Sequence, residues 1–149
     1  MTLAKKLHIK DGQKVLVASA PRAIFDSIDA PEGATVRTRG HGPFDIVLSF
    51  VSKRADVDAA FREARDALAK EGALWLAYPK KTGGIETDLT RDVGWDFVAR
   101  AGWAPVSQIS IDETWSALRF KQDPELQAER ARRRGARLSQ RKTVSIKRG

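Results

Sequence analysis

The residues best suited to chemistry lie in the segment Lys80-Lys81-Thr82-Gly83-Gly84, directly after an apolar run. Glycines let backbone N–H groups approach an anion closely, and two lysines add positive charge. The segment could therefore bind a phosphate, a carboxylate or a nucleotide. It is not a P-loop, because the lysines precede the glycines and the Gly-x-x-x-x-Gly-Lys-Ser/Thr spacing is absent. The alternative is a solvated turn in which a lysine pairs with Asp88 or Asp92.

Two groups of acidic residues could complement these lysines. Asp88 lies in a Thr/Asp-rich segment that resembles a helix start, where capping is the alternative to a ligand-binding or catalytic role. Asp112 and Glu113 separate two apolar runs, and ordinary turn chemistry also favours acids there. A strand that returned antiparallel would bring Asp112 and Trp115 near Lys80, in an arrangement suited to proton transfer. We assign no catalytic residue, and the candidate ligand-binding residues are Lys80, Lys81, Gly83, Gly84, Asp88, Asp112 and Trp115.

Composition argues against several other kinds of site. The chain has no Cys, which excludes disulfides, thiolate chemistry and Cys-ligated zinc. His8 and His41 lack the paired spacing of a helical metal site, so we expect no metal and no cofactor. A Gly-x-Ser-x-Gly elbow is absent, which argues against an α/β-hydrolase. No apolar stretch approaches the roughly 18 residues that a membrane helix needs. We therefore expect a cytoplasmic protein with no membrane partner, and the oligomeric state stays open.

The elements that must position the candidate site alternate between strand and helix. Strands are predicted at residues 14–21, 44–51 and 73–79, and helices at 55–71 and 90–101, with a short helix from Pro21 and a closing antiparallel hairpin of 106–111 and 114–120. Gly72 is expected to end the first long helix at a positive φ. This order predicts an α/β fold, with a mostly parallel, Rossmann-like sheet and flanking helices. Ligands bind such sheets at the C-terminal ends of the strands, where Lys80 falls.

Residues 35–38 are ambiguous. Their composition allows a brief strand, but only about five residues separate them from the strand at 44–51. A parallel connection needs about a dozen residues or more. The segment is therefore expected to be an antiparallel edge strand or no strand.

The basic residues are concentrated at the C-terminus. The net charge is +8, and residues 121–149 hold ten Lys and Arg against three acidic residues. The rest of the chain is nearly neutral, so we predict an α/β domain over 1–121 and a basic, flexible tail over 122–149. A loosely packed helix over 124–134 is the alternative. The tail could bind nucleic acid phosphates without sequence preference, through Arg132, Arg133, Arg134, Arg137, Arg141 and Lys142.

Two resemblances extend this interpretation. The Phe-Asp strand, the long helix, "KEGALWLAYP", a further helix and the hairpin resemble the second half of Rossmann-type methyltransferases. In that family a Gly-rich loop follows the first strand, whereas the corresponding loop of this chain, "VASAPRA", has no glycine. An acidic residue ends the family's second strand, whereas residues 35–39 of this chain end in Arg37 and Arg39. The chain is also similar, over about residues 7–121, to the bacterial family catalogued as domain of unknown function 3052. The matching pieces are "FDIVLSFV", "GALWLAYPKK", "TDLTRDV" and "DETWSALRFK".

Three classes of function follow from these observations. The first is a cytoplasmic domain that binds an anionic small molecule at the C-terminal edge of its sheet without catalysis. The second is a degenerate group transferase of the S-adenosylmethionine type that uses the same edge. The third is a nucleic-acid-associated protein that acts through its tail.

Overall fold

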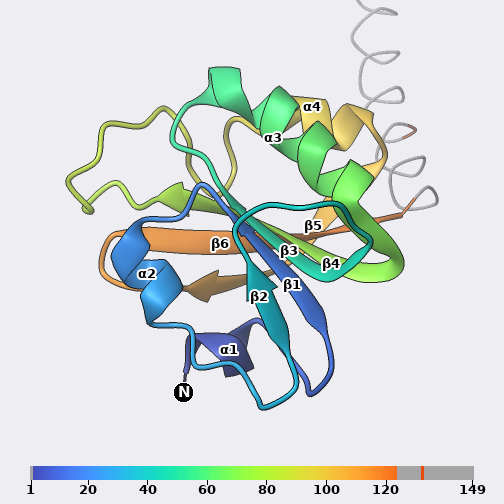
Figure 1. Ribbon diagram of the computed structural model, residues 1–149. Coiled ribbons are helices and arrows are strands. Elements are labelled where there is room, and N and C mark those ends of the chain that lie inside the picture. Colours follow the sequence, from blue (N-terminus) through green and yellow to red (C-terminus); the bar gives the residue numbers. More distant parts are fainter. Residues whose placement is uncertain (1, 124–131, 133–149) are drawn as a thin grey trace, which may run out of the picture.

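The computed structural model describes residues 2–123 and Arg132, and its core is one six-stranded sheet. The strands are β1 (Lys14–Ala18), β2 (Thr35–Arg37), β3 (Phe44–Phe50), β4 (Leu68–Pro79), β5 (Trp103–Ser110) and β6 (Trp115–Gln122). Their order across the sheet is β2-β1-β3-β4-β6-β5 (Figure 1). The first four strands in this order are parallel, while β6 runs antiparallel to both β4 and β5. The predicted α/β class, the mostly parallel sheet and the closing hairpin are confirmed.

Helices cover both faces of the sheet (Figure 1). One face carries α1 (Leu3–Lys6) and α2 (Arg22–Asp26), and the other carries α3 (Arg54–Ala67) and α4 (Asp96–Arg100). The buried residues accordingly form two clusters, one on each side of the sheet. Because both faces are covered, β3 and the second half of β4 are apolar nearly throughout, as in other buried parallel strands.

Helix α3 buries Val57, Phe61 and Ala64 at four- and three-residue steps, as the sequence predicts. It ends at Ala67, however, and the prediction that Gly72 terminates it is wrong. Gly72 lies inside β4, where the strand passes close to an irregularity in β3. A Cβ atom on Gly72 would lie 2.9 Å from the carbonyl oxygen of Asp45. The glycine is therefore required for close approach of two backbones and not for a positive φ.

Both expectations for residues 35–38 are wrong, because β2 is an edge strand that pairs parallel with β1. The expectation assumed that this segment would lie beside β3, whereas β1 lies between the two. Residues 38–43 make the connection from β2 to β3. Six residues reach about 20 Å, which suffices because β2 is only three residues long.

The helix predicted over 90–101 is reduced to the five residues of α4. Upstream of it, Thr90 Oγ1 accepts hydrogen bonds from the backbone N–H groups of Asp92 and Val93, at 3.2 and 3.1 Å. Gly94 then adopts a φ of 109°. Side-chain hydrogen bonds of this kind offer the backbone an alternative to a helix. Residues 80–95 therefore form a long loop at the C-terminal ends of β3 and β4.

Candidate functional site

Lys80 connects the end of β4 to the β5–β6 hairpin. Its ammonium group donates hydrogen bonds to Ser110 Oγ and to the carbonyl oxygen of Asp112, both at 2.7 Å. Its backbone N–H donates to the carbonyl oxygen of Thr114, also at 2.7 Å. The antiparallel return of β6 thus places Asp112 beside Lys80, but through the backbone of Asp112 and not through its carboxylate. An ammonium group with two protein acceptors has less capacity left for a ligand.

The carboxylate of Asp112 stabilises the turn that contains it. Its Oδ1 atom accepts hydrogen bonds from the backbone N–H groups of Thr114 and Trp115, both at 2.8 Å. The indole of Trp115 is buried and meets the ring of Phe50 edge to face, with the ring centroids 4.9 Å apart. Gly83 packs against this turn, since a Cβ atom on it would lie 2.7 Å from the carbonyl oxygen of Thr114. These predicted ligand-binding residues therefore come together mainly through turn formation and packing.

Lys81 and Gly84 remain exposed in the same loop. Within residues 2–123, the ammonium group of Lys81 makes neither a hydrogen bond nor an ion pair. Gly84 has a φ of 82°, which a glycine adopts without strain. Of the two lysines, Lys81 is therefore the one available to an anion.

Asp88 caps a helix, but a different helix from the one expected. Its Oδ1 atom accepts a hydrogen bond of 2.7 Å from the backbone N–H of Arg54, the first residue of α3. Next to it, Thr87 Oγ1 donates to the carbonyl oxygen of Ser52, just beyond β3, at 2.6 Å. The loop of residues 80–95 is thereby held against the start of α3, and Asp88 lies apart from the group around Lys80.

The chain order of the strands identifies another position at the same edge. From β1 the chain passes to β2 on one side, and it then returns to β3 and β4 on the other side. The C-terminal ends of β1 and β3 therefore border the topological switch point, where α/β sheets bind their ligands. This position does not include Lys80, which follows β4.

Two cavities lie beside the C-terminal end of β1, and both are lined by Thr38. The smaller one, of about 240 Å³, also contacts Ser19, Arg22 and Phe25. The larger one, of about 380 Å³, lies on the α3 side and extends from Ala18 and Thr38 to the C-terminal end of α3; its lining includes Arg39, His41, Glu63 and Asp66. Arg39 makes no ion pair or hydrogen bond within the part of the chain that the structure describes. Sequence reasoning did not name these residues as site candidates, although Thr38 ends a possible strand and Arg39 follows it.

Ser19 forms the turn after β1 without a glycine. It has a φ of 62°, in the left-handed region that residues other than glycine rarely adopt. Its turn leads to Pro21, which precedes α2. Where methyltransferases carry a Gly-rich loop, this chain thus places a serine in a conformation more usual for glycine, at the edge of a cavity.

Tyr78 near the end of β4 is the chain's single tyrosine, which makes its ionisation directly measurable. Burial raises the pKa of Tyr78 above its ordinary value of 10.0, although hydrogen bonds from Ser116 and Gln108 and the charge of Arg91 oppose this. The Gln108 amide donates to the phenol oxygen at 2.9 Å. We expect the ultraviolet absorbance of phenolate to develop in the folded protein at a higher pH than in the unfolded chain.

The same shift has a consequence for stability. The folded state favours the neutral phenol of Tyr78. Its contribution to the free energy of unfolding is therefore fully present below pH 10.0 and is lost as the pH rises through the folded pKa. Urea unfolding across this range should show a stability that falls with pH, and a Tyr78→Phe variant should show a smaller fall. A phenolate midpoint at or below that of the unfolded chain would contradict the expectation.

The remaining predicted features are only partly within the described residues. Of the six tail residues proposed to bind nucleic acid, Arg132 is described and is exposed, whereas Arg133, Arg134, Arg137, Arg141 and Lys142 lie outside the described part. Strand β6 extends to Gln122, at the predicted start of the tail. Among residues 2–123 and Arg132, no three His, Asp or Glu side chains are grouped to hold a metal ion. None of the helices in this part is long and apolar enough to cross a membrane.

The comparisons with known proteins bear on the fold. No protein-family model and no curated protein matches the chain, so the resemblance to domain of unknown function 3052 stays a prediction. Among solved structures, a putative type 11 methyltransferase from Sulfolobus solfataricus has a TM-score of 0.53 at 11% identity, over 81% of this chain and 89% of that one. The ribosomal protein L11 methylase of Lactobacillus delbrueckii subsp. bulgaricus scores 0.51 at 7% identity, over 80% and 74%.

A SAM-dependent methyltransferase from Aquifex aeolicus scores 0.50 at 9% identity, over 79% of this chain and 86% of that one. At such low identity the likeness establishes architecture and not activity. The chain has the Rossmann-like α/β fold that these methyltransferases share.

Proposed function

We propose that this chain is a binding domain for an anionic small molecule, held at the C-terminal edge of the sheet beside β1. The observation that carries the proposal is the pair of cavities that share Thr38 at the topological switch point. Arg39 lines the larger cavity and has no partner within the described residues. A guanidinium group in this position can bind a phosphate or a carboxylate with two parallel hydrogen bonds.

Other groups around the cavities suit the same class of ligand. The hydroxyl groups of Ser19 and Thr38 can donate to phosphate or ribose oxygens. Arg22 pairs with Asp26 at 3.2 Å, but both side chains are largely exposed. Exposed pairs of this kind contribute little, so Arg22 can turn to a ligand at small cost. A nucleotide would place its phosphate and its base in the two neighbouring cavities.

The lysines after β4 have a secondary part in this proposal. Lys80 is engaged with Ser110 and Asp112, so Lys81 is the lysine that would reach an anion at this edge. The tail's contact with nucleic acid and the cytoplasmic location remain predictions.

A group transferase of the S-adenosylmethionine type is the second candidate, and the shared fold supports it. The larger cavity has Arg39 and His41 on one wall and Glu63 and Asp66 on helix α3. Walls of opposite charge suit a ligand that carries both an ammonium and a carboxylate group, as S-adenosylmethionine does. The end of β2 has Arg37 and Arg39 in place of an acidic residue for the ribose, and arginine suits a phosphate group, which favours the first candidate.

Isothermal titration calorimetry with AMP, inorganic phosphate and S-adenosylhomocysteine would test both candidates. We expect AMP to bind and Arg39→Gln to weaken its binding about tenfold, because a charge-assisted pair is lost. Lys81→Gln is the matched control at the other turn of the same edge, and it should change AMP affinity less.

Three outcomes would decide between the possibilities. Heat with S-adenosylhomocysteine alone would favour the transferase. Weaker AMP binding in Lys81→Gln with no change in Arg39→Gln would place the ligand at the β4 turn and overturn the position beside β1. Absence of heat with all three compounds would reject the proposed function.

A further inference from the structure

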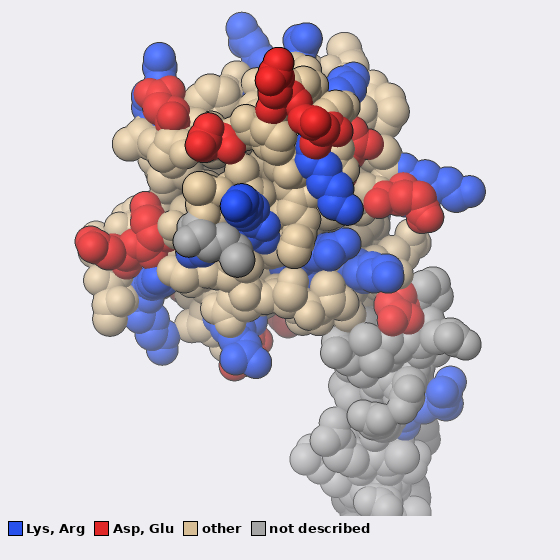
Figure 2. Space-filling model, turned by 90° about the horizontal axis from the view of Figure 1, so that it is seen from below, with Lys and Arg blue, Asp and Glu red and all other residues tan. Residues whose placement is uncertain are grey.

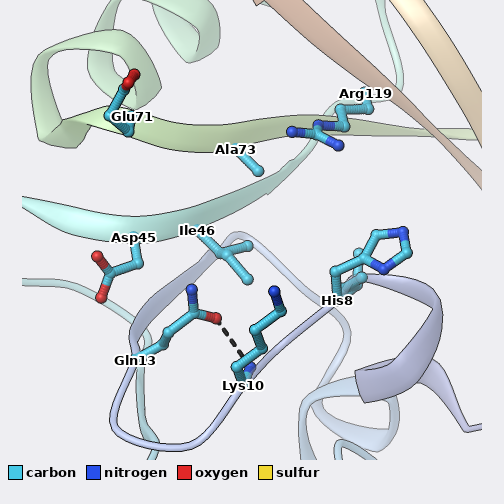
Figure 3. A pocket seen from close by; sticks show the side chains of 9 residues that line it. His8, Lys10, Gln13, Asp45, Ile46, Glu71, Ala73 and Arg119 are labelled. Atoms are coloured by element: carbon cyan, nitrogen blue, oxygen red, sulfur yellow. Dashed lines mark hydrogen bonds between the residues drawn. The ribbon is translucent and has the colours of Figure 1, made fainter.

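A third cavity lies at the opposite end of the sheet, beside the N-terminal ends of β3 and β4 and on the side that carries α1 (Figure 3). Its volume is about 330 Å³, within the range of small-molecule sites. Buried Leu7 and Ile46, together with Ala73, supply its apolar lining. The polar side chains around it are those of His8, Lys10, Gln13, Asp45, Glu71 and Arg119.

Arg119 on β6 is the unusual residue of this cavity. Its Nε atom is buried and has no hydrogen-bond partner among the described residues. The residue faces the same side of the sheet as its register partner Trp75, whose indole Nε1 is also buried without a partner. Buried donors without an acceptor are rare in folded proteins, and each one calls for an explanation. Two of them on adjacent strands indicate a local excess of donors.

Lys10 and Gln13 add further donors from the loop before β1. The backbone N–H of Lys10 donates to Gln13 Oε1 at 2.8 Å, which fixes the amide so that its NH₂ group is the free end. Figure 3 shows the Lys10 ammonium, the Gln13 NH₂ group and the Arg119 guanidinium directed toward the interior of the cavity. The Lys10 ammonium makes no hydrogen bond or ion pair within residues 2–123.

The two acidic residues at the rim do not neutralise these donors. Asp45 Oδ2 accepts a hydrogen bond of 2.8 Å from the backbone N–H of Lys14. In Figure 3 the carboxylates of Asp45 and Glu71 point away from Lys10 and Arg119. The wider surface has the same arrangement, since Lys and Arg side chains cross the middle of the lower face while Asp and Glu lie mostly toward its margins (Figure 2).

We propose that this cavity is a second binding site, for a small molecule that carries a carboxylate or a phosphate group. The oxygens of that group accept hydrogen bonds from Arg119, Lys10 and Gln13, while its carbon skeleton packs on Ile46 and Ala73. Such a ligand supplies the acceptor that Arg119 Nε lacks in the protein alone. The site is independent of the one beside β1, because the two share no lining residue.

Thermal unfolding of the full chain with sodium succinate and with sodium phosphate would test the site, each against sodium chloride at equal ionic strength. A ligand that binds only the folded state raises the unfolding temperature. We expect at least one of the two anions to raise the unfolding temperature more than sodium chloride does. The anion with the larger effect identifies the bound group as carboxylate or phosphate.

Two variants connect this shift to the cavity. Arg119→Met removes the orphan donor, and Gln13→Glu keeps the oxygen that Lys10 uses while it replaces the NH₂ donor by negative charge. Each should weaken anion binding about tenfold, as expected when a charge-assisted contact is lost or reversed. Arg100→Gln, on α4 at the other face of the sheet, is the matched control, because it removes one exposed positive charge outside both proposed sites and should leave the shift unchanged.

The proposal fails if neither anion acts beyond sodium chloride, or if both variants respond like the unmodified chain. If Arg119→Met does not fold, Gln13→Glu decides alone, since it preserves the hydrogen bond from Lys10. A shift lost in Arg39→Gln and kept in Gln13→Glu would assign the anion to the cavities beside β1. That result would support the proposed function and reject the second site.

Discussion

Replacing Phe61 with alanine is expected to lower the free energy of unfolding by about 3–5 kcal/mol, the range for aromatic side chains deleted from a core. Phe61 on α3 is completely buried. Its ring meets Trp103 and Phe97 edge to face, with centroid separations of 5.5 and 6.1 Å. The side chain therefore connects α3 to α4 and to the first residue of β5. Its loss leaves a cavity between three elements that cannot all move together. Urea unfolding followed by tryptophan fluorescence would measure the effect.

Phe25→Ala on α2 is the matched control, because it removes the same side chain from a half-buried position on the other face of the sheet. Its cost should be clearly smaller, since less apolar area returns to water. Equal losses in the two variants would contradict the assignment of Phe61 to the centre of the core. A loss below about 1 kcal/mol for Phe61→Ala would contradict it as well.

Lys80→Met is expected to lower the free energy of unfolding by about 2 kcal/mol, because hydrogen bonds from a charged donor are lost. Methionine keeps most of the apolar stem and removes only the ammonium group. That group now donates to Ser110 Oγ and to the carbonyl oxygen of Asp112. Its removal leaves the β5–β6 hairpin attached to the end of β4 mainly through their backbone ladder and the contact from Lys80 N to Thr114 O.

Lys81→Met provides the comparison, since Lys81 is the adjacent lysine and its ammonium group has no partner within residues 2–123. Its effect on stability should be within about 0.5 kcal/mol of zero, as for most surface substitutions. If Lys80→Met were equally neutral while it abolished anion binding, Lys80 would be a ligand-binding residue and its structural role would be rejected. The pair of variants therefore separates the two interpretations of the most conspicuous motif in the sequence.

The sequence by itself determined the elements whose signals are local. Strand β3 and the second half of β4 are short apolar runs, and α3 repeats Val57, Phe61 and Ala64 at helical spacing. These patterns depend only on which face of an element is buried, so they can be read without knowing its neighbours. The alternation of such elements was enough to predict the α/β class and the closing hairpin.

Only the tertiary structure decided the features that depend on a partner far along the chain. The three residues of β2 are a strand because β1 offers them a parallel edge. Gly72 lies inside a strand because β3 passes too close for a side chain. Asp88 caps α3, whose first residue precedes it by 34 positions, and no local pattern contains that information.

The candidate sites divide in the same way. Residue types alone made Lys80 and Lys81 candidates for anion binding. The hydrogen-bond acceptors of the Lys80 ammonium group, however, lie 30 and 32 residues further along the chain, on the returning hairpin. Arg39 and Arg119 were not candidates for binding in the sequence, and they became so only when folding placed them beside cavities without partners of their own among the described residues. Whether a charged side chain is satisfied or available is set by long-range packing, because its hydrogen-bond partners come from strands that are neighbours in the sheet and distant in the chain.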